Sequence, residues 1–181
     1  MKDSTFDSRH EDLRMAQQLA YAPAGLVCKN FQLEDESSDY GASEFEVNNF
    51  RTKFRIGKKT PKKSGSFVTL WKRTGQGPIA PCSFNDPIDF YVVSARNGND
   101  LGQFIFPKSV LSYRGILANE SQEGKRAFRI YAPWDQTPNQ QAKKTKEWQS
   151  PFFITIDKHV DLSAFRRLFF LTSHSHLFLS P

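Results

Sequence analysis

Alternating apolar and polar residues mark several extended segments in the middle of the chain. The strongest span residues 66–73, 88–96 and 101–106 and are rich in β-branched and aromatic side chains. Asn97-Gly98-Asn99-Asp100 lies between the last two and favours a hairpin turn. Weaker alternation predicts further extended segments at 26–33, 45–56, 126–131 and 152–156.

Helical periodicity lies nearer the two ends of the chain. Residues 7–20 carry a modest apolar stripe, and Asp7 or Ser8 is placed to cap the helix. Residues 138–149 begin with a proline, which the first helical turn tolerates. The remaining predictions are short helices at 109–111 and 161–171, a basic loop at 57–65 and a turn at 74–78. Together these elements predict an α+β fold with a mixed, mostly antiparallel central sheet flanked by helices.

The composition favours one packed domain over residues 1–181. Hydrophobic residues make up 38% of the chain and include 17 phenylalanines, which supplies enough apolar surface for a core. Cys28 and Cys82 lie far apart and form no CxxC motif, so we expect free thiols in a reducing cytosol. The start of the chain has no signal-peptide core, and the apolar stretch 168–179 is far shorter than the ~20 residues that cross a bilayer. We therefore expect a cytoplasmic protein that does not enter a membrane.

Charge is distributed unevenly along the sequence. Residues 1–50 hold ten acids and four bases, whereas residues 51–73 hold nine bases and no acid. An acid-free basic run beside an acidic half is typical of a protein that binds a polyanion. The alternative is a solvated basic loop without a ligand.

Three basic clusters, interleaved with aromatic residues, form the candidate nucleic-acid interface, since phosphates need cations and unpaired bases add stacking. Trp71 is expected in the core, whereas Trp134 is expected either to contact the ligand or to cap the core. The candidate contact residues are Lys58, Lys59, Lys62, Lys63, Arg73, Lys125, Arg126, Arg129, Trp134, Lys143 and Lys144.

Several separate motifs resemble the MepB family, a bacterial family whose namesake is encoded beside a multidrug efflux pump. They are IGKKTPKKSGSFVTLWKR at 56–73, and the segments 79–81, 89–93, 102–108, 124–134 and 141–149. The resemblance covers roughly residues 7–155 and leaves the tail at 157–181 unassigned. It implies a fold similar to type II restriction endonucleases, the PD-(D/E)xK architecture. A shared fold does not fix the function, so the site needs its own argument.

A nuclease of this architecture needs acids that hold a divalent metal, and a lysine beside the attacking water. If the hairpin turns at Gly98-Asn99, Asp89 lies opposite Lys108, where the aspartate and lysine of such a site would fall. The acid expected two residues before the lysine is absent, because that position is Phe106. Asp89 and Lys108 are therefore a structural ion pair, a degenerate nuclease site or an intact site for Mg²⁺.

The sequence thus favours a DNA-binding protein with a degenerate nuclease-like site, linked by the resemblance to a drug or stress response. The alternatives are a Mg²⁺-dependent DNA nuclease and a module that binds a protein or a small anion. We expect no cofactor unless the nuclease alternative holds, and no metal site at His174 and His176, which lie two apart in a serine-rich tail. The oligomeric state stays open.

Overall fold

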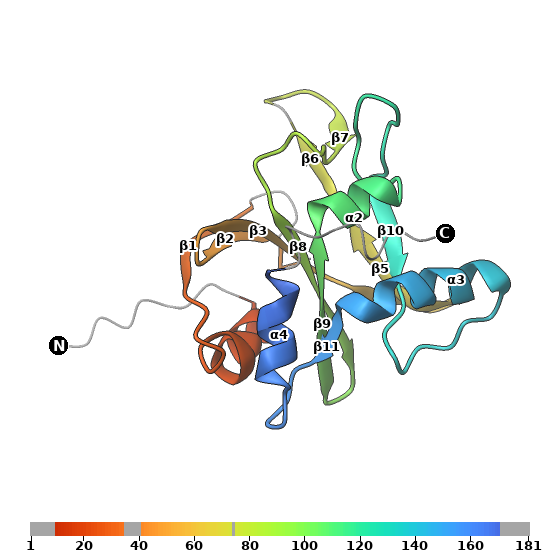
Figure 1. Cartoon of the computed structure of the whole chain (residues 1–181). Helices are drawn as coiled ribbons and strands as arrows, with labels where there is room; N and C mark the ends of the chain where they lie inside the picture. Colours follow the sequence, from red (N-terminus) through yellow and green to blue (C-terminus); the bar gives the residue numbers. More distant parts are fainter. Residues whose placement is uncertain (1–9, 35–40, 74, 171–181) are drawn as a thin grey trace.

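The computed structural model describes residues 10–34, 41–73 and 75–170 (Figure 1). The cap proposed at Asp7 or Ser8, the first residue of the 74–78 turn and the histidines of the tail lie outside the described residues.

A six-stranded mixed sheet forms the centre of the fold, in the order β1-β2-β3-β8-β9-β11. β3 and β8 run parallel, and every other neighbouring pair in this sheet is antiparallel. This confirms the predicted α+β class with a mostly antiparallel sheet. The strands are β1 (Cys28–Leu33), β2 (Ser43–Val47), β3 (Phe50–Ile56), β8 (Phe90–Asn97), β9 (Asp100–Pro107) and β11 (Phe153–Thr155).

The expected basic loop at 57–65 is wrong, because this segment forms most of a hairpin. β4 (Lys58–Thr60) and β5 (Lys63–Thr69) pair antiparallel around a turn at Pro61 and Lys62, and β10 (Ala127–Ile130) pairs with the other edge of β5. Proline is favoured early in such turns, and lysines are common on edge strands, so the residues fit a hairpin as well as a loop. Gly65 has a φ of +74°, and a Cβ there would come within 2.6 Å of the Ile130 carbonyl oxygen.

The single strand expected at 66–73 is also divided. Leu70 separates β5 from β6 (Trp71–Arg73), which pairs with β7 (Ile79–Pro81) in a separate two-stranded sheet. Period-two patterning cannot show where a chain leaves one sheet for another, because the alternation continues through the change. The β6–β7 hairpin projects away from α3 at the top of Figure 1.

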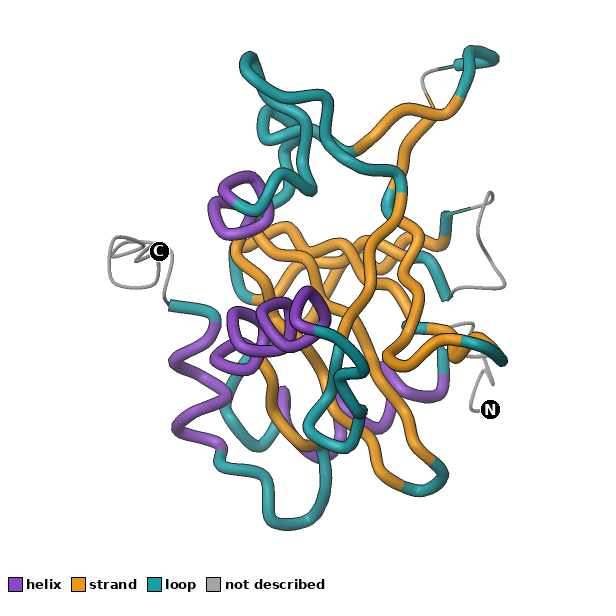
Figure 2. Tube along the Cα trace, turned by 90° about the vertical axis from the view of Figure 1, so that its right-hand side faces the viewer, coloured by secondary structure: helices purple, strands orange, loops and turns teal. Residues whose placement is uncertain are grey.

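Helices cover both faces of the central sheet. One face carries α1 (Glu11–Ala16), the π-helical turn Gln17–Tyr21 and α4 (Leu162–Leu168). The other carries α2 (Lys108–Tyr113), α3 (Gln140–Gln149) and the 3₁₀ turn Ser150–Phe152, together with the β10-β5-β4 sheet (Figures 1 and 2). The side chains of His10, Asn139 and Asp161 cap α1, α3 and α4 by accepting a hydrogen bond from a backbone N–H.

Strand alternation builds a separate core on each face. Phe90 and Val92 of β8 point into the core under α1 and α4, whereas Tyr91 and Val93 point into the core under the small sheet. Among the described residues, no helix is long and apolar enough to cross a membrane. Cys28 and Cys82 both lie in the described part and form no disulfide.

Two buried tyrosines differ in how their hydroxyl groups are satisfied. The Tyr21 hydroxyl donates to Gln103 Oε1 at 3.1 Å, whereas the Tyr91 hydroxyl is buried with no hydrogen-bond partner among the described residues. Burial raises the pKa of Tyr91, so its side chain is neutral at physiological pH. A buried hydroxyl without a partner costs roughly 1–3 kcal/mol.

We predict opposite effects for the two Tyr→Phe changes. Tyr91→Phe should raise the free energy of unfolding by about 1 kcal/mol, because it removes an unsatisfied group and leaves the ring in place. Tyr21→Phe should lower it by about 1 kcal/mol, because Gln103 loses a partner. Urea unfolding of both variants beside wild type measures the pair. A loss of stability in Tyr91→Phe would contradict the prediction and indicate a partner for that hydroxyl.

Candidate nucleic-acid interface

The β8–β9 hairpin has the register predicted from the sequence. Phe90 pairs with Pro107 and Asn97 with Asp100, and the Lys108 N–H donates to the Asp89 carbonyl oxygen at 3.0 Å. Asp89 and Lys108 are therefore cross-strand neighbours, as expected.

Their side chains nevertheless have separate partners. The Asp89 carboxylate accepts a hydrogen bond from the Arg51 N–H at 2.9 Å, and the Lys108 ammonium lies 5.1 Å from the centre of the Phe84 ring. No ion pair joins Asp89 to Lys108 in the part of the chain that the structure describes.

Phe106 is fully buried where a nuclease of this architecture would place its second acid. Its ring contacts those of Phe128, Trp148 and Phe152, with centroids 5.6–6.3 Å apart. A carboxylate would be desolvated at this position and would displace an aromatic core. Within residues 10–34, 41–73 and 75–170, no group of three or more His, Cys, Asp or Glu side chains is arranged to hold a metal ion.

A groove of about 540 Å³ lies between the edge strand β10 and α3. Figure 2 shows α3 beside the strands of the small sheet. The cationic residues that line the groove are Lys63 of β5, Arg114 after α2, Lys125 before β10 and Arg129 within β10. None of the described lining residues is acidic. The groove therefore joins four cations from separate segments in one concave, positively charged surface.

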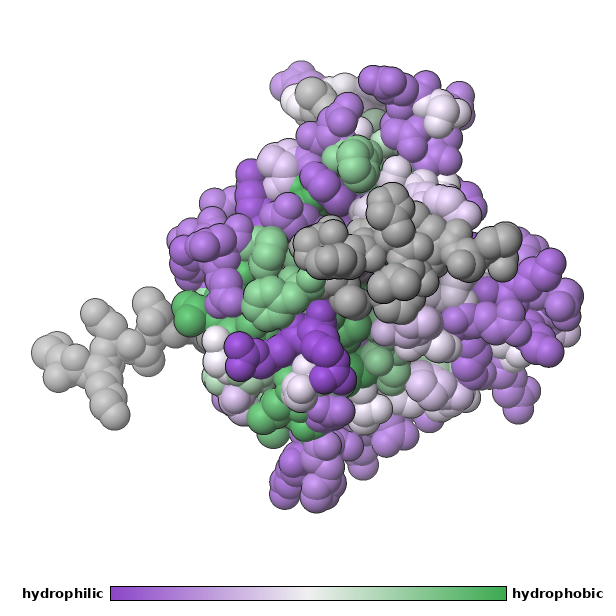
Figure 3. Space-filling model, viewed as in Figure 1, coloured by the Kyte–Doolittle hydropathy of each residue, from purple (hydrophilic) through white to green (hydrophobic). Residues whose placement is uncertain are grey.

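Aromatic rings and polar groups complete the groove. Trp148 and Phe128 line it, and the Arg114 guanidinium lies 5.3 Å from the Trp148 ring centre, which holds this cation against the wall. Gln141, Ala142 and Thr145 line the α3 wall beside Trp148, and Phe128 lines the β10 wall. The surface over α3 is hydrophilic (Figure 3).

A buried glutamine fixes the distance between the two walls. Gln149 of α3 accepts a hydrogen bond from the Tyr131 N–H at 2.9 Å and donates to the Arg129 carbonyl oxygen at 2.8 Å. The side chain thus bonds to the edge of β10 as a neighbouring strand would. The groove is rigid at this end because both of these hydrogen bonds are buried or partly buried.

Two of the basic residues near α3 stabilise the 133–135 loop. Lys59 forms an ion pair with the buried carboxylate of Asp135, and Lys146 donates to the carbonyl oxygens of Pro133 and Asp135. The Asp135 carboxylate also accepts from the Ala132 N–H at 2.8 Å. Lys59, which the sequence suggested as a ligand contact, therefore has a structural partner.

The other candidates are spread over the surface. Lys62 lies at the β4–β5 turn, and Lys58 is on the outward face of that hairpin, opposite Phe67. Arg73 donates to the Gly77 carbonyl oxygen and Arg126 to that of Ile79, so both lie at the β6–β7 hairpin, not in the groove. On α3, Lys144 precedes Trp148 by one turn at the groove rim, whereas Lys143 falls on the opposite side. Trp134 packs against Phe153, with ring centres 5.6 Å apart, and so caps the core.

Arg114 and Trp148 are groove residues that the sequence did not indicate. Arg114 is an isolated base between α2 and the next turn, and Trp148 lay in a helix without a visible apolar stripe. No local signal distinguishes them from surface residues, because their role depends on α2, α3 and β10 meeting in space.

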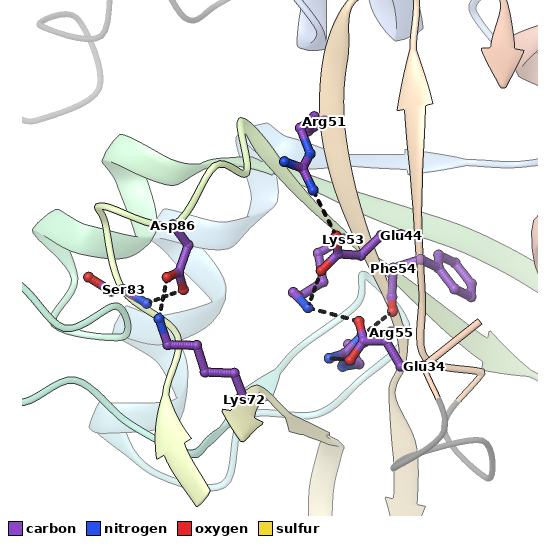
Figure 4. Close-up of polar contacts among 9 residues, drawn as sticks. All are labelled: Glu34, Glu44, Arg51, Lys53, Phe54, Arg55, Lys72, Ser83 and Asp86. Carbon is purple, nitrogen blue, oxygen red and sulfur yellow. Dashed lines mark hydrogen bonds and ion pairs between the residues drawn. The ribbon is translucent and has the colours of Figure 1, made fainter. Parts of the chain in front are cut away.

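A second polar cluster, formed by buried and half-buried charges, lies on β2 and β3 (Figure 4). Glu34 bonds to Lys53 at 2.8 Å and to Arg55 at 2.7 Å, and Glu44 bonds to Lys53 at 2.6 Å. The Arg55 and Lys53 side chains are only 2% and 8% exposed. Burial opposes the charge of Glu34, but Arg55 and Lys53 outweigh it and lower the pKa of that carboxyl group. Each of these charges has a partner within the cluster, so the network links the residue that follows β1 with β2 and β3.

These features define an α+β protein with a mixed central sheet, a core on each face of that sheet and a basic groove between β10 and α3. The MepB-like family model matches residues 34–155, and the chain belongs to this family. A solved structure of MepB is 29% identical in sequence, with a TM-score of 0.70 over 82% of this chain and 99% of that one. The MepB resemblance expected from the sequence motifs is thereby confirmed. No match was found among curated proteins.

We predict that Glu34→Gln destabilises the protein in a pH-dependent way. The folded pKa of Glu34 is lowered, so its stabilising effect is present above the ordinary value of 4.5 and is lost as the pH falls. At pH 7 the variant should lose about 3 kcal/mol, because Arg55 stays buried without its carboxylate. Between pH 6 and pH 3 its free energy of unfolding should change less than that of wild type.

Denaturant unfolding at several pH values measures this effect. Glu123→Gln is the matched control, because it makes the same change at an exposed position. Equal pH profiles for Glu34→Gln and wild type would contradict the assigned role of the network.

Proposed function

We propose that this protein binds nucleic acid, DNA in the first instance, through the groove between β10 and α3. The observation that carries the proposal is the convergence of Lys63, Arg114, Lys125 and Arg129 on one groove whose described lining has no acid. Cations arranged in this way neutralise phosphates and release counterions, which is the main source of non-specific affinity for nucleic acids.

A polymeric anion fits the groove better than a small one. The four cations come from separate elements, namely the β4–β5 hairpin, the end of α2, and β10 with the segment that leads into it. Lys62 and Lys144 extend the positive surface beyond each rim. A single small anion would be served by donors that meet at one point, whereas a phosphate backbone uses donors in a row.

We further infer that the fold is a degenerate relative of the restriction-endonuclease core. The cross-strand register of Asp89 and Lys108 and the resemblance of the motifs support this inference. The bacterial cytoplasm and a drug or stress response are the setting that the resemblance implies.

A Mg²⁺-dependent DNA nuclease is the second candidate, and the placement of Asp89 against Lys108 is the observation in its favour. Phe106 weighs against it, because a phenyl ring offers no oxygen to a hard cation. We therefore rank binding without cleavage first.

We predict that the double change Lys63→Ala and Lys125→Ala weakens DNA binding by at least 10-fold at low salt. Both side chains are exposed, so the fold should tolerate their loss. The slope of log K against log salt should fall by about 1.8 for duplex DNA if each lysine neutralises one phosphate. Fluorescence anisotropy at several salt concentrations measures both quantities.

Lys143→Ala with Lys158→Ala is the matched control, because it removes the same charge from exposed positions outside the groove. If both double variants lose affinity to the same extent, net charge and not the groove explains binding. If wild type fails to bind even at low salt, the proposal is wrong and a protein-binding or small-anion module replaces it.

Cleavage provides a separate prediction. Supercoiled plasmid incubated with the protein and Mg²⁺ or Mn²⁺ should stay uncut, because Phe106 leaves Asp89 without a second carboxylate. Gel electrophoresis of wild type beside Asp89→Ala measures this. Cleavage by wild type that Asp89→Ala abolishes would establish the nuclease instead.

A further inference from the structure

A second hollow, of about 450 Å³, lies on the outward face of the β4–β5 hairpin, next to the groove. Its residues are Thr60, Pro61, Lys62, Lys63, Phe67 and Arg129. Phe67 is half-buried, and it lies on the outward face of β5 because the next residue, Val68, is fully buried in the core on the inward face. The rings of Phe67 and Pro61 supply an apolar surface, and the two lysines and the arginine surround it with positive charge.

Arg129 connects this hollow to the groove. Its guanidinium donates to the Ser64 carbonyl oxygen at 3.1 Å and to Thr60 Oγ1 at 2.9 Å, and it lies 6.0 Å from the Phe67 ring centre. These two hydrogen bonds use two of its five N–H groups and hold the side chain in place. Arg129 and Lys63 line both cavities, so the two form one continuous surface.

We propose that the hollow receives an unpaired base of single-stranded nucleic acid, whose neighbouring phosphates lie in the basic groove. This inference rests on the proposed function and adds the class of strand. A base has an apolar π-face that stacks on Phe67, and its backbone carries the charge that Lys63 and Arg129 neutralise.

The geometry favours a single strand over a duplex. In a duplex the bases are stacked inside and present only their edges, so an aromatic ring that lines a hollow gains little from them. In a single strand each base has a face available for stacking. A preorganised cation beside an aromatic ring is the combination that single-strand binders use, because one contacts the backbone and the other the base.

The test compares three labelled ligands by fluorescence anisotropy: a 12-nucleotide oligo-dT, the same backbone with abasic sites throughout, and a 12-base-pair duplex. We expect wild type to bind oligo-dT more tightly than either other ligand. Phe67→Leu should weaken oligo-dT binding by roughly 10-fold and leave abasic and duplex binding unchanged, because leucine keeps the apolar volume without the π-face. Phe67→Trp should retain the oligo-dT affinity of wild type, because it keeps an aromatic face for stacking.

Phe84→Leu is the matched control, since it makes the same change at a phenylalanine that is 37% exposed and lines neither cavity. It should leave all three affinities unchanged, and thermal melting should show that both leucine variants stay folded. Two results would overturn the proposal that the hollow binds a base and would leave nucleic-acid binding intact. One is equal wild-type affinity for duplex and oligo-dT, and the other is an equal loss of affinity for all three ligands in Phe67→Leu. If none of the three ligands binds wild type at 50 mM salt, the proposed function fails as well.

Discussion

The packing of Phe106 between two layers is the interaction on which the rest of the structure depends. Its ring belongs to β9 of the central sheet and contacts Phe128 of β10, Trp148 of α3 and Phe152 of the 3₁₀ turn. These are the elements that form the groove, so the side chain that stabilises the second core also places the walls of the groove. The same ring occupies the position at which a nuclease would need a carboxylate. One residue therefore both occupies that position and orders the walls of the groove.

Buried polar interactions then hold together the elements that the aromatic core brings into contact. Gln149 joins α3 to the edge of β10, and Asp135 connects Lys59 with the loop before α3. Such buried bonds are costly to leave unmade, so they restrict the walls to one arrangement. Arg129 is held in the same way by Thr60 and Ser64. A ligand that meets these cations pays little for ordering them, which favours affinity.

The two ends of the sheet differ in physical character. On the face of the central sheet that packs against the small sheet, β8 and β9 are covered by aromatic and aliphatic residues. On the same face, β2 and β3 carry the charged network of Glu34, Glu44, Lys53 and Arg55. The positive charges of that network are neutralised within the protein. The groove has no acid among its described lining residues, so its positive charges are not neutralised within that lining.

The sequence by itself determined the fold class, the β8–β9 hairpin with its Asp89–Lys108 register, the helices and the family, because these depend on local pattern and turn chemistry. It also showed that position 106, where a nuclease of this architecture would carry its second acid, is a phenylalanine. Only the tertiary structure decided that the basic segment 57–65 forms most of a hairpin and that Lys59 forms an ion pair with Asp135. It also showed that Arg114 and Trp148 line the same groove as Lys63, Lys125 and Arg129. The physical reason is that these features arise from contacts between residues that are far apart in the sequence, which no local pattern records. They include the pairing of strands, an ion pair between distant residues, and a groove between a helix and a sheet edge.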